Sequence, residues 1–340
     1  MPATPGLVQT TGLYRPLLGT DVEIRVAATD AAVAATAEGA AVEQFLRAQR
    51  LFSVFDPDSA LCRWRAGADP APELADLLAV AARWWARVDG AFHPVTAGLH
   101  RRWRQAEVDG RVPSRSELAQ LAAGIAELPY AVDRCGARAL VRRLGDCADV
   151  DLNALAKGYA VDLAVAAALA IPGVAAVGVN AGGDIRHAGC GSVRVGVEDP
   201  ARTAANAPRL AVVELVQAAV ATSGSAHRGF QVAGRWLGHV IDPRSGWPVT
   251  HTLAATVIAD DATTADALAT ALVVLDPSEA VELADDLGIA ALLVPAEPTP
   301  ARVRLSRAWP ADDGRAPGSA GQRGPARSPA GPAGQPGAPE

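Results

Sequence analysis

The sequence predicts an α+β fold in which much of the sheet is antiparallel. Strand-like runs crowd into residues 174–259, and no helix-length pattern separates them. Helical patterns come before this region and after it instead. A doubly wound parallel sheet needs a helix between successive strands, so this order favours α+β. Because 50% of the 340 residues are hydrophobic, the chain can bury a sizeable core.

The first half of the chain predicts one strand followed by mainly helical segments. In the strand at 21–28, Val22, Ile24 and Val26 share one face, as in a half-buried strand. The elements expected after it are an alanine-rich helix at 31–50, a loop at 51–64, helices at 73–88 and 115–127, and a strand at 138–144.

The second half supplies most of the sheet. The expected strands are 174–180, 192–198, 210–221, 230–241 and 253–259, and the expected helices are 154–170, 262–275 and 278–287. Proline, glycine and alanine dominate the end of the chain without an apolar period, which is typical of a disordered tail. We therefore expect a flexible N-terminus at 1–14, one domain at 15–309 and a disordered tail at 310–340.

Bulk properties exclude several functional classes. The net charge is −6, and no stripe of basic residues with interleaved aromatics occurs, so we expect no nucleic-acid partner. No apolar run approaches the roughly 18 residues of a membrane span, and the N-terminus does not resemble a secretory signal. A cytoplasmic location is expected. The four cysteines include no C-x-x-C pair, which argues against a zinc knuckle or a redox pair.

The run 151–162, "DLNALAKGYAVD", concentrates scarce residue types. Lys157 is the only lysine of the chain, and Asn153 and Tyr159 stand in the same run. We expect Asp151 to end a strand and a helix to begin shortly after it. The free N–H groups at a helix start attract anions, and a lysine adds a full positive charge. A single lysine can equally be a solvated surface residue.

Two glycine-containing strand ends are candidate anion sites. In "NAGGDIRHAG" (180–189), Gly182 and Gly183 would let the backbone approach a ligand closely, or form a plain hairpin turn. In "ATSGSAHRG" (221–229), small hydroxyls, a glycine and an arginine suit an anionic group, although such loops are common. The residues concerned are Thr222, Ser223, Gly224 and Arg228.

The segment "HVIDPRSGWPV" (239–249) combines a turn with charged groups. Asp242 begins the turn, since its side chain can accept local backbone bonds. Arg244 adds a cation and His239 adds a base that titrates near neutral pH. The apolar neighbours of His239 also permit a structural role in the core.

Asp266 and Thr270 form the strongest metal candidate. They stand at i and i+4 of an expected helix and therefore share one face. A carboxylate and a hydroxyl are hard oxygen ligands, which suit Mg²⁺ bound to phosphates rather than zinc. In the alternative, Thr270 bonds back to its own helix and Asp266 is merely exposed. Together, these features suggest binding or cleavage of a diphosphate, although no Walker loop, complete dinucleotide fingerprint or nucleophile elbow occurs.

The order of these motifs resembles that of the FAD:protein FMN transferases, the ApbE family. The matching segments are "DLNALAKGYAVD", "NAGGDI", "ATSG" with a following "RG", "HVIDPRSGWPV" and "ADALATAL", and nearer the start "LLGTDVEIRV", "FSVFDPDSALCRW" and "GAFHPVTAGL". The resemblance covers about residues 15–309. One such motif is weak, but five in register are specific.

The resemblance implies a T-fold-like core and a Mg²⁺-dependent enzyme. Such an enzyme binds FAD, moves its FMN half onto a threonine or serine of a target flavoprotein and releases AMP. Two alternatives stay open. One is an FAD pyrophosphatase that gives FMN and AMP with water as acceptor, and the other is a flavin-binding protein without activity.

Site residues follow from the matching positions. Asp266 and Thr270 match the metal ligands, with the backbone carbonyl of Ala154, and His239 matches the proposed base, with Asp242 in its turn. Lys157, and Arg228 or Arg244, would hold phosphate oxygens. The FAD contacts expected in full are Leu18, His93, Asp151, Lys157, Asn180, Gly182, Gly183, Asp184, Thr222, Ser223, Gly224, Arg228, Ile241 and Arg244. Replacing Lys157 by alanine is expected to weaken the use of FAD far more than folding.

Three residues differ from the family pattern, at positions that the resemblance places around the flavin or adenine rather than the metal. His93 replaces an aspartate that contacts FAD, Ala226 marks the loss of an aromatic residue, and Arg65 replaces an asparagine. These differences are expected to affect the affinity for FAD and the choice of acceptor protein more than the phosphoryl chemistry.

Overall fold

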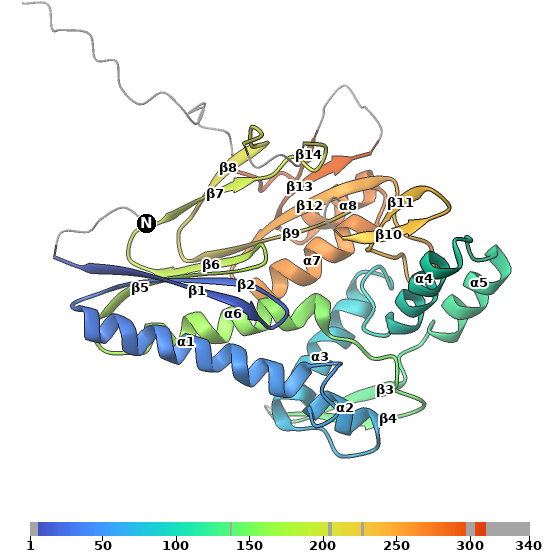
Figure 1. Ribbon diagram of the computed structural model, residues 1–340, viewed down its shortest axis with the longest axis horizontal. Helices are drawn as coiled ribbons and strands as arrows, with labels where there is room; N and C mark the ends of the chain where they lie inside the picture. Colours follow the sequence, from blue (N-terminus) through green and yellow to red (C-terminus); the bar gives the residue numbers. More distant parts are fainter. Residues whose placement is uncertain (1–5, 137, 203–205, 226–227, 297–302, 311–340) are drawn as a thin grey trace, which may run out of the picture. The chain divides into compact units, whose positions relative to one another are not determined.

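An antiparallel sheet of eight strands forms the centre of the fold (Figure 1). The computed structural model describes residues 6–136, 138–202, 206–225, 228–296 and 303–310. In spatial order, the strands are β1 (Val8–Leu17), β2 (Thr20–Ala28), β5 (Val174–Ala181), β6 (Asp184–Gly189), β9 (Ala218–Gly224), β12 (Thr252–Ala259), β13 (Ala290–Pro295) and β14 (Arg304–Leu305). Each neighbouring pair is antiparallel, so the α+β prediction is confirmed.

Three long helices cover the sheet. They are α1 (Ala31–Phe52), α6 (Asn153–Leu169) and α7 (Ala262–Val274). Figure 1 shows α1 and α6 side by side against the strands, and α7 packs on β9 and β12. Ten of the 13 residues of α7 are buried, as are eight of the 17 in α6. A helix that is apolar on most faces lies between other elements rather than at the surface, which is where α6 and α7 are found.

The remaining elements surround this core. The helices are α2 (Ala60–Arg65), α3 (Pro72–Arg87), α4 (Ala97–Asp109), α5 (Arg115–Gly124) and α8 (Pro277–Asp286). The strand pairs are β3 (Tyr130–Cys135) with β4 (Arg138–Arg143), β7 (Val193–Val197) with β8 (Ala211–Leu215), and β10 (Gly229–Val232) with β11 (Arg235–Gly238).

A second hydrophobic cluster joins α4 and α5 to the β10–β11 hairpin. Trp103 of α4 and Phe230 of β10 are both fully buried in it, and their rings lie 6.1 Å apart. The Trp103 indole N–H donates a 2.8 Å hydrogen bond to the carbonyl of Gly246. This cluster therefore anchors the segment 239–249, which the sequence singles out as functional.

Several expected elements differ from the structure. The loop at 51–64 contains the end of α1 and most of α2, and the run 210–221 divides into β8 and β9 at Gln217, which has φ of 49°. The run 230–241 is the β10–β11 hairpin, because Ala233 and Gly234 have φ of 50° and 75° and form a two-residue turn.

The ends of the chain also differ in part from the expectation. Residues 8–14 belong to β1 and pair with β2, rather than forming a flexible segment, because a full antiparallel register binds them to the sheet. The chain up to Pro310 forms one compact unit. The expected tail lies outside the described residues from 311 onwards, and the boundaries at 15 and 309 stay predictions.

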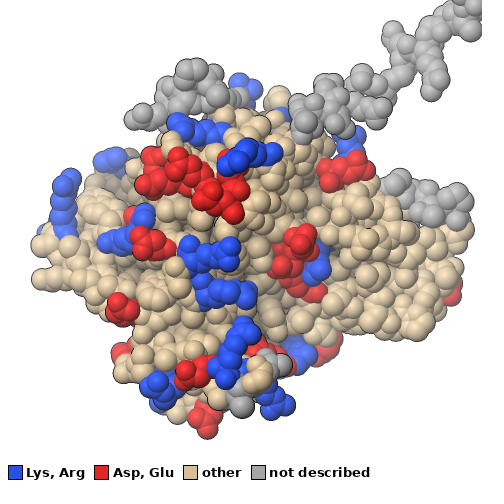
Figure 2. Space-filling view, turned by 180° about the vertical axis from the view of Figure 1, so that it is seen from behind, with Lys and Arg blue, Asp and Glu red and all other residues tan. Residues whose placement is uncertain are grey.

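Acidic and basic side chains lie next to one another on the face in Figure 2. Mixed charge of this kind creates no long-range attraction for a polyanion. Among the described residues, no helix combines the length and apolar character needed to cross a bilayer. The cytoplasmic location stays a prediction.

Candidate active site

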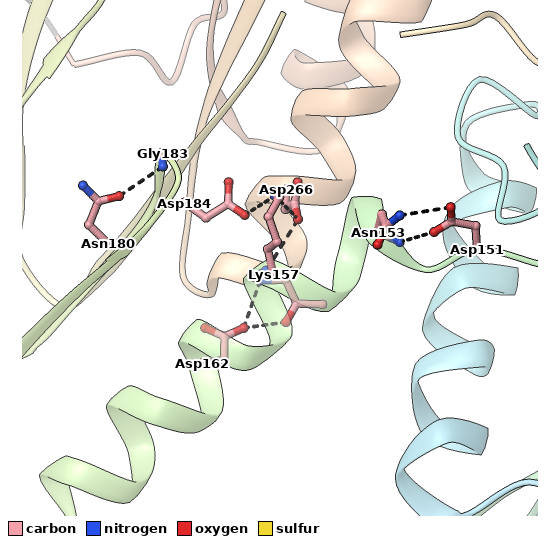
Figure 3. Close-up of polar contacts among 10 residues, drawn as sticks. Asp151, Asn153, Lys157, Asp162, Asn180, Gly183, Asp184 and Asp266 are labelled. Atoms are coloured by element: carbon pink, nitrogen blue, oxygen red, sulfur yellow. Dashed lines mark hydrogen bonds and ion pairs between the residues drawn. The ribbon is translucent and has the colours of Figure 1, made fainter. Parts of the chain in front are cut away.

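The start of α6 is shaped by Asp151 and Asn153. One carboxylate oxygen of Asp151 accepts the backbone N–H of Asn153 at 2.8 Å, and the other accepts its side-chain amide at 3.0 Å (Figure 3). Burial raises the pKa of Asp151. The expectation that Asp151 ends a strand is wrong, because β4 ends at Arg143. Its backbone N–H instead donates to the carbonyl of Pro94 at 2.6 Å, which ties the helix start to the segment around His93.

A glycine lets α6 approach α7 closely. A Cβ atom at Gly158 would lie 2.3 Å from the carbonyl oxygen of Ala262 and 2.9 Å from the Cα of Thr263. No side chain fits there, so glycine is required where these helices meet. The close approach brings the residue before this glycine, Lys157, to the face of α7 that carries Asp266.

Lys157 lies between two carboxylates from different elements (Figure 3). Its ammonium Nζ is 2.5 Å from Oδ2 of Asp184 on β6 and 3.0 Å from Oδ2 of Asp266 on α7. The side chains are 24%, 3% and 8% exposed, respectively. The sequence interpretation of Lys157 as a solvated surface residue is therefore wrong. We call these three residues the buried cluster.

The buried cluster has two acidic groups for one cation. Burial alone would lower the pKa of Lys157, but attraction to Asp266 and Asp184 outweighs it and holds the pKa above its usual value. Burial and the neighbouring Asp266 raise the pKa of Asp184 well above its usual value, despite the opposing effect of Lys157. The excess of acidic groups indicates a place where further positive charge is favoured.

The donor set here fits Mg²⁺. Asp266 is buried rather than merely exposed, and no hydrogen bond from the Thr270 hydroxyl to another described residue is present. Both observations argue against the alternative in which Thr270 bonds back to its own helix and Asp266 is merely exposed. The described residues contain no group of three or more His, Cys, Asp and Glu side chains able to hold a metal. Oxygen donors with few side-chain ligands are typical of Mg²⁺, which keeps several waters. The contribution of the Ala154 carbonyl stays a prediction.

Gly182 and Gly183 form the two-residue turn of the β5–β6 hairpin. Ala181 pairs with Asp184 across the turn, and the two glycines have φ of 61° and 101°. Asn180 accepts the N–H of Gly183 at 3.1 Å through its side-chain oxygen. Of the two roles considered for these glycines, the structure shows the hairpin turn. This turn places Asp184 at the start of β6, where it faces Lys157.

Thr222, Ser223 and Gly224 lie in β9 rather than in a loop. The hydroxyl oxygen of Thr222 is 2.9 Å from that of Thr256 on β12, which occupies it within the sheet. A Cβ atom at Gly224 would lie 2.7 Å from the carbonyl oxygen of Leu253, so this glycine allows close strand pairing. Arg228 is exposed, and Ala226 lies outside the described residues.

His239 is held by the backbone of Arg228. The carbonyl of Arg228 accepts the His239 backbone N–H at 3.0 Å and lies 3.3 Å from the ring Nδ1. Burial, followed by electrostatic interactions with His100, Arg228 and Lys157, lowers the pKa of His239 to about 4. The imidazole is therefore neutral at pH 7. The expectation of a pKa near neutral does not hold for this base.

Arg244 is engaged by Asp242. The carboxylate of Asp242 accepts the backbone N–H of Arg244 at 3.0 Å, its Nε at 2.9 Å and its Nη2 at 3.2 Å. The turn expected from the sequence is present, with a backbone bond from Gly246 to the Asp242 carbonyl at 2.8 Å. Ile241 is buried in the second hydrophobic cluster.

His93, which stands where the family resemblance implies an aspartate, forms a local turn bond. Its Nδ1 accepts the N–H of Val95 at 3.1 Å, which is the bond to the second following residue that an aspartate side chain makes in turns. Burial lowers the pKa of His93 to about 4, so the ring is neutral. Leu18 lies in the β1–β2 turn with φ of 52°.

His93 and Arg244 share a cleft of 1030 Å³. Trp85 and Trp247 line the same cleft, together with Arg115 and several alanines. The structure thus brings together Lys157, Asp184 and Asp266 in one group, and His93 and Arg244 in another. A cleft of this size can accommodate a dinucleotide.

Sequence reasoning did not assign Asp162 and Arg186, which contact each other at 2.6 Å beside the buried cluster. The available signal is that Asp162 is the only acidic residue of α6, an otherwise apolar helix. Tyr159, whose role the sequence left open, packs edge-on against Phe52 with ring centroids 5.6 Å apart.

The pattern of residues 18–293 matches the family model described as "ApbE family". The chain belongs to the ApbE family. Curated relatives named FAD:protein FMN transferase include that of Salmonella typhimurium, 30% identical over 292 residues and covering 82% of each chain, and that of Escherichia coli K12, 29% identical over 312 residues and covering 87% of each. The transferase names of these ApbE relatives confirm the expectation of a transferase.

Solved ApbE structures have the same fold. The ApbE protein of Thermotoga maritima superposes with a TM-score of 0.74 at 29% identity, covering 88% of this chain and 97% of its own. The apo flavinyl transferase ApbE of Pseudomonas stutzeri has a TM-score of 0.70 at 26% identity, with 89% and 95% covered. The resemblance seen in the motif order is therefore confirmed at the level of family and fold.

Proposed function

We propose that this chain transfers the FMN moiety of FAD onto a threonine or serine hydroxyl of a target flavoprotein in a Mg²⁺-dependent reaction and releases AMP. The observation that supports this most is the buried cluster, in which two carboxylates and one lysine from three elements converge. Relatives named FAD:protein FMN transferase align over most of the chain.

Each member of the metal site has a defined contribution. Asp266, Thr270 and the Ala154 carbonyl would hold Mg²⁺, which when bound neutralises charge on the diphosphate. Lys157 presents its ammonium to phosphate oxygens, and Asp184 orients that ammonium through the 2.5 Å contact. A lysine already held in place loses little freedom when the substrate binds, which favours the transition state.

His239 acts as the base through one nitrogen. A carbonyl oxygen only accepts hydrogen bonds, so the Nδ1 beside the Arg228 carbonyl carries the proton and Nε2 is the free acceptor. Nε2 takes the proton of the acceptor hydroxyl, the hydroxyl oxygen bonds to the phosphorus of the FMN half, and the phosphoanhydride bond to AMP breaks. Asp242 and Arg244 keep the following turn in place.

The cleft beside His93 receives part of the FAD. Arg244 and Arg115 supply positive charge, and Trp85 and Trp247 offer flat faces for a planar ring. The remaining predicted FAD contacts, Leu18, Asn180, Gly183 and Ile241 among them, stay predictions of the family resemblance.

One experiment tests the proposal against its alternatives. The protein is incubated with FAD, Mg²⁺ and a flavin-acceptor domain, and AMP release and acceptor mass are followed together. An adduct with the mass of FMN on a threonine or serine supports the transfer. AMP release without an adduct on any acceptor tested indicates a pyrophosphatase, and bound FAD without AMP release contradicts both enzyme assignments.

A further inference from the structure

Asp162 connects the three elements that carry the buried cluster. Its carboxylate accepts Nη1 of Arg186 on β6 at 2.6 Å. It also accepts the backbone N–H groups of Ala262 and Thr263 at the start of α7, both at 2.9 Å, and the hydroxyl of Thr263 at 2.5 Å. One side chain of α6 thus binds β6 and α7 at the same time.

These contacts lie close in sequence to the three cluster residues. Asp162 is five residues after Lys157 on α6, Arg186 is two residues after Asp184 on β6, and Thr263 is three residues before Asp266 on α7. Figure 3 shows Asp162 and Lys157 on successive turns of α6, both directed toward α7. The carboxylate therefore joins the same backbone segments that carry Lys157, Asp184 and Asp266.

Helix capping alone does not account for Asp162. The start of α7 already has its own cap, because Asp261 accepts the N–H of Thr264 at 2.7 Å and its hydroxyl at 3.0 Å. Asp162 adds hydrogen bonds from α6 to the start of α7 and an ion pair with Arg186 on β6. The side chain of Asp162 is 15% exposed and that of Arg186 is 25% exposed. Asp261 and Asp162 thus stabilise the same helix start, but of these two aspartates Asp162 is the one that also joins α6 to β6.

We propose that Asp162 is a positioning residue, whose carboxylate sets the distances from Lys157 Nζ to the carboxylates of Asp184 and Asp266. The effect on catalysis rests on the proposed function, whereas the effect on these distances does not. Misplacing reacting groups by about 1 Å can cost on the order of 100-fold in rate. The carboxylate acts only through the cluster residues and does not touch the substrate.

The single lysine provides one spectroscopic reporter of the surroundings of its ammonium group within the buried cluster. Protein labelled with ¹⁵N at the lysine side chain gives one Nζ signal, that of Lys157. The test variants are Asp162→Asn, which keeps the shape but loses one acceptor oxygen and the charge, and Arg186→Met, which removes only the bond to β6. The matched control is Asp261→Ala, which removes the side-chain cap of α7 and leaves the bonds of Asp162 to β6 and α7 in place.

The expected result separates positioning from stability. Asp162→Asn and Arg186→Met should move the Lys157 signal, and with FAD they should lower kcat for AMP release about 10- to 100-fold with little change in KM. Asp261→Ala should lower Tm but leave the Lys157 signal unmoved and kcat within about two-fold. An unmoved signal in both test variants would overturn the inference, as would an equal displacement in the control. If the wild type releases no AMP, the proposed function fails while the signal still decides on the spacing.

Discussion

The candidate site combines two regions whose polar groups are held in different ways. The buried cluster draws Lys157, Asp184 and Asp266 from three elements, and Lys157 and Asp266 are 109 positions apart in sequence. The charged side chains of the turn at 242–244 are held by short-range contacts instead, such as the pairing of Asp242 with Arg244 two positions later. The Arg244 side chain is 40% exposed, against 3% for Asp184.

This difference predicts how each region responds to substitution. The cluster forms only when the whole fold is in place, and its charges have little access to water, so unbalancing it is costly. The turn at Asp242 forms from its own local bonds, and water can replace lost contacts at its exposed arginine. Substitutions that leave a cluster charge without its partner should therefore change stability and chemistry together, whereas substitutions of the exposed polar groups in the segment should mainly change chemistry.

The largest expected effect on turnover comes from Asp266→Asn. The asparagine is a weaker oxygen donor without charge, so Mg²⁺-dependent AMP release should fall by more than about 1000-fold. Folding should survive, because Lys157 keeps its contact with Asp184 and the excess of acidic groups is removed. Kinetics at several Mg²⁺ concentrations and circular dichroism measure both effects.

The control for this variant is Asp260→Asn, which changes an exposed aspartate just before the same helix. Its turnover should equal that of the wild type. Unchanged Mg²⁺-dependent activity in Asp266→Asn would refute the metal assignment.

Lys157→Met tests whether the cluster couples stability to chemistry. It leaves Asp184 and Asp266 buried without their cation, and removing one partner of a buried ion pair costs about 3–5 kcal/mol. The free energy of unfolding, measured in urea, should fall by that order, and the use of FAD should fall as well. The expectation from the sequence, that replacing this lysine weakens the use of FAD far more than folding, stays a prediction, and this measurement tests it. A loss below about 1 kcal/mol would show that the cluster is not the constraint we describe.

The pH dependence of His239 sharpens the chemical role of the second region. Burial, with nearby His100, Arg228 and Lys157, lowers the pKa of this base to about 4. Since the unprotonated ring is the active form, kcat/KM should not decline near pH 6.5 but only as the pH falls toward about 4. His239→Gln should lower kcat by about 100-fold or more. An acidic limb near 6.5 in the wild type that vanishes in His239→Gln would disprove the neutral, buried base.

Long periodic segments of the fold were predictable from the sequence. The helices containing Lys157 and Asp266 and the strands β2, β5 and β12 appear within a few residues of the predicted bounds, whereas β6 was not among the expected strands. The sequence missed α4, because only three of its 13 residues, Leu99, Trp103 and Ala106, are buried, and most of the others are polar or charged. It also missed the break at Ala233–Gly234, where a left-handed alanine supplies half of the turn.

The site was predictable in composition but not in arrangement. Asp266 and Thr270 share a helix face, so local periodicity alone brings them together. The convergence of Lys157 with Asp184 depends on the close contact at Gly158 and on the β5–β6 turn, which are properties of the tertiary fold. Motif order suggested one wall of an FAD site, and only packing could show that Lys157 is paired with two carboxylates.

The smallest expected change in stability is that of Arg244→Gln. The substitution removes two side-chain hydrogen bonds to Asp242 but keeps the backbone bond at 3.0 Å, so the turn persists. Exposed pairs of this kind contribute about 0–1 kcal/mol, and the free energy of unfolding should fall by no more than that. KM for FAD should nevertheless rise, because Arg244 supplies positive charge to the 1030 Å³ cleft. Both variants, Arg244→Gln and Lys157→Met, are measured under the same conditions. A comparable loss of stability in the two would remove the distinction between the regions, because the locally bonded turn would then be as sensitive as the buried cluster.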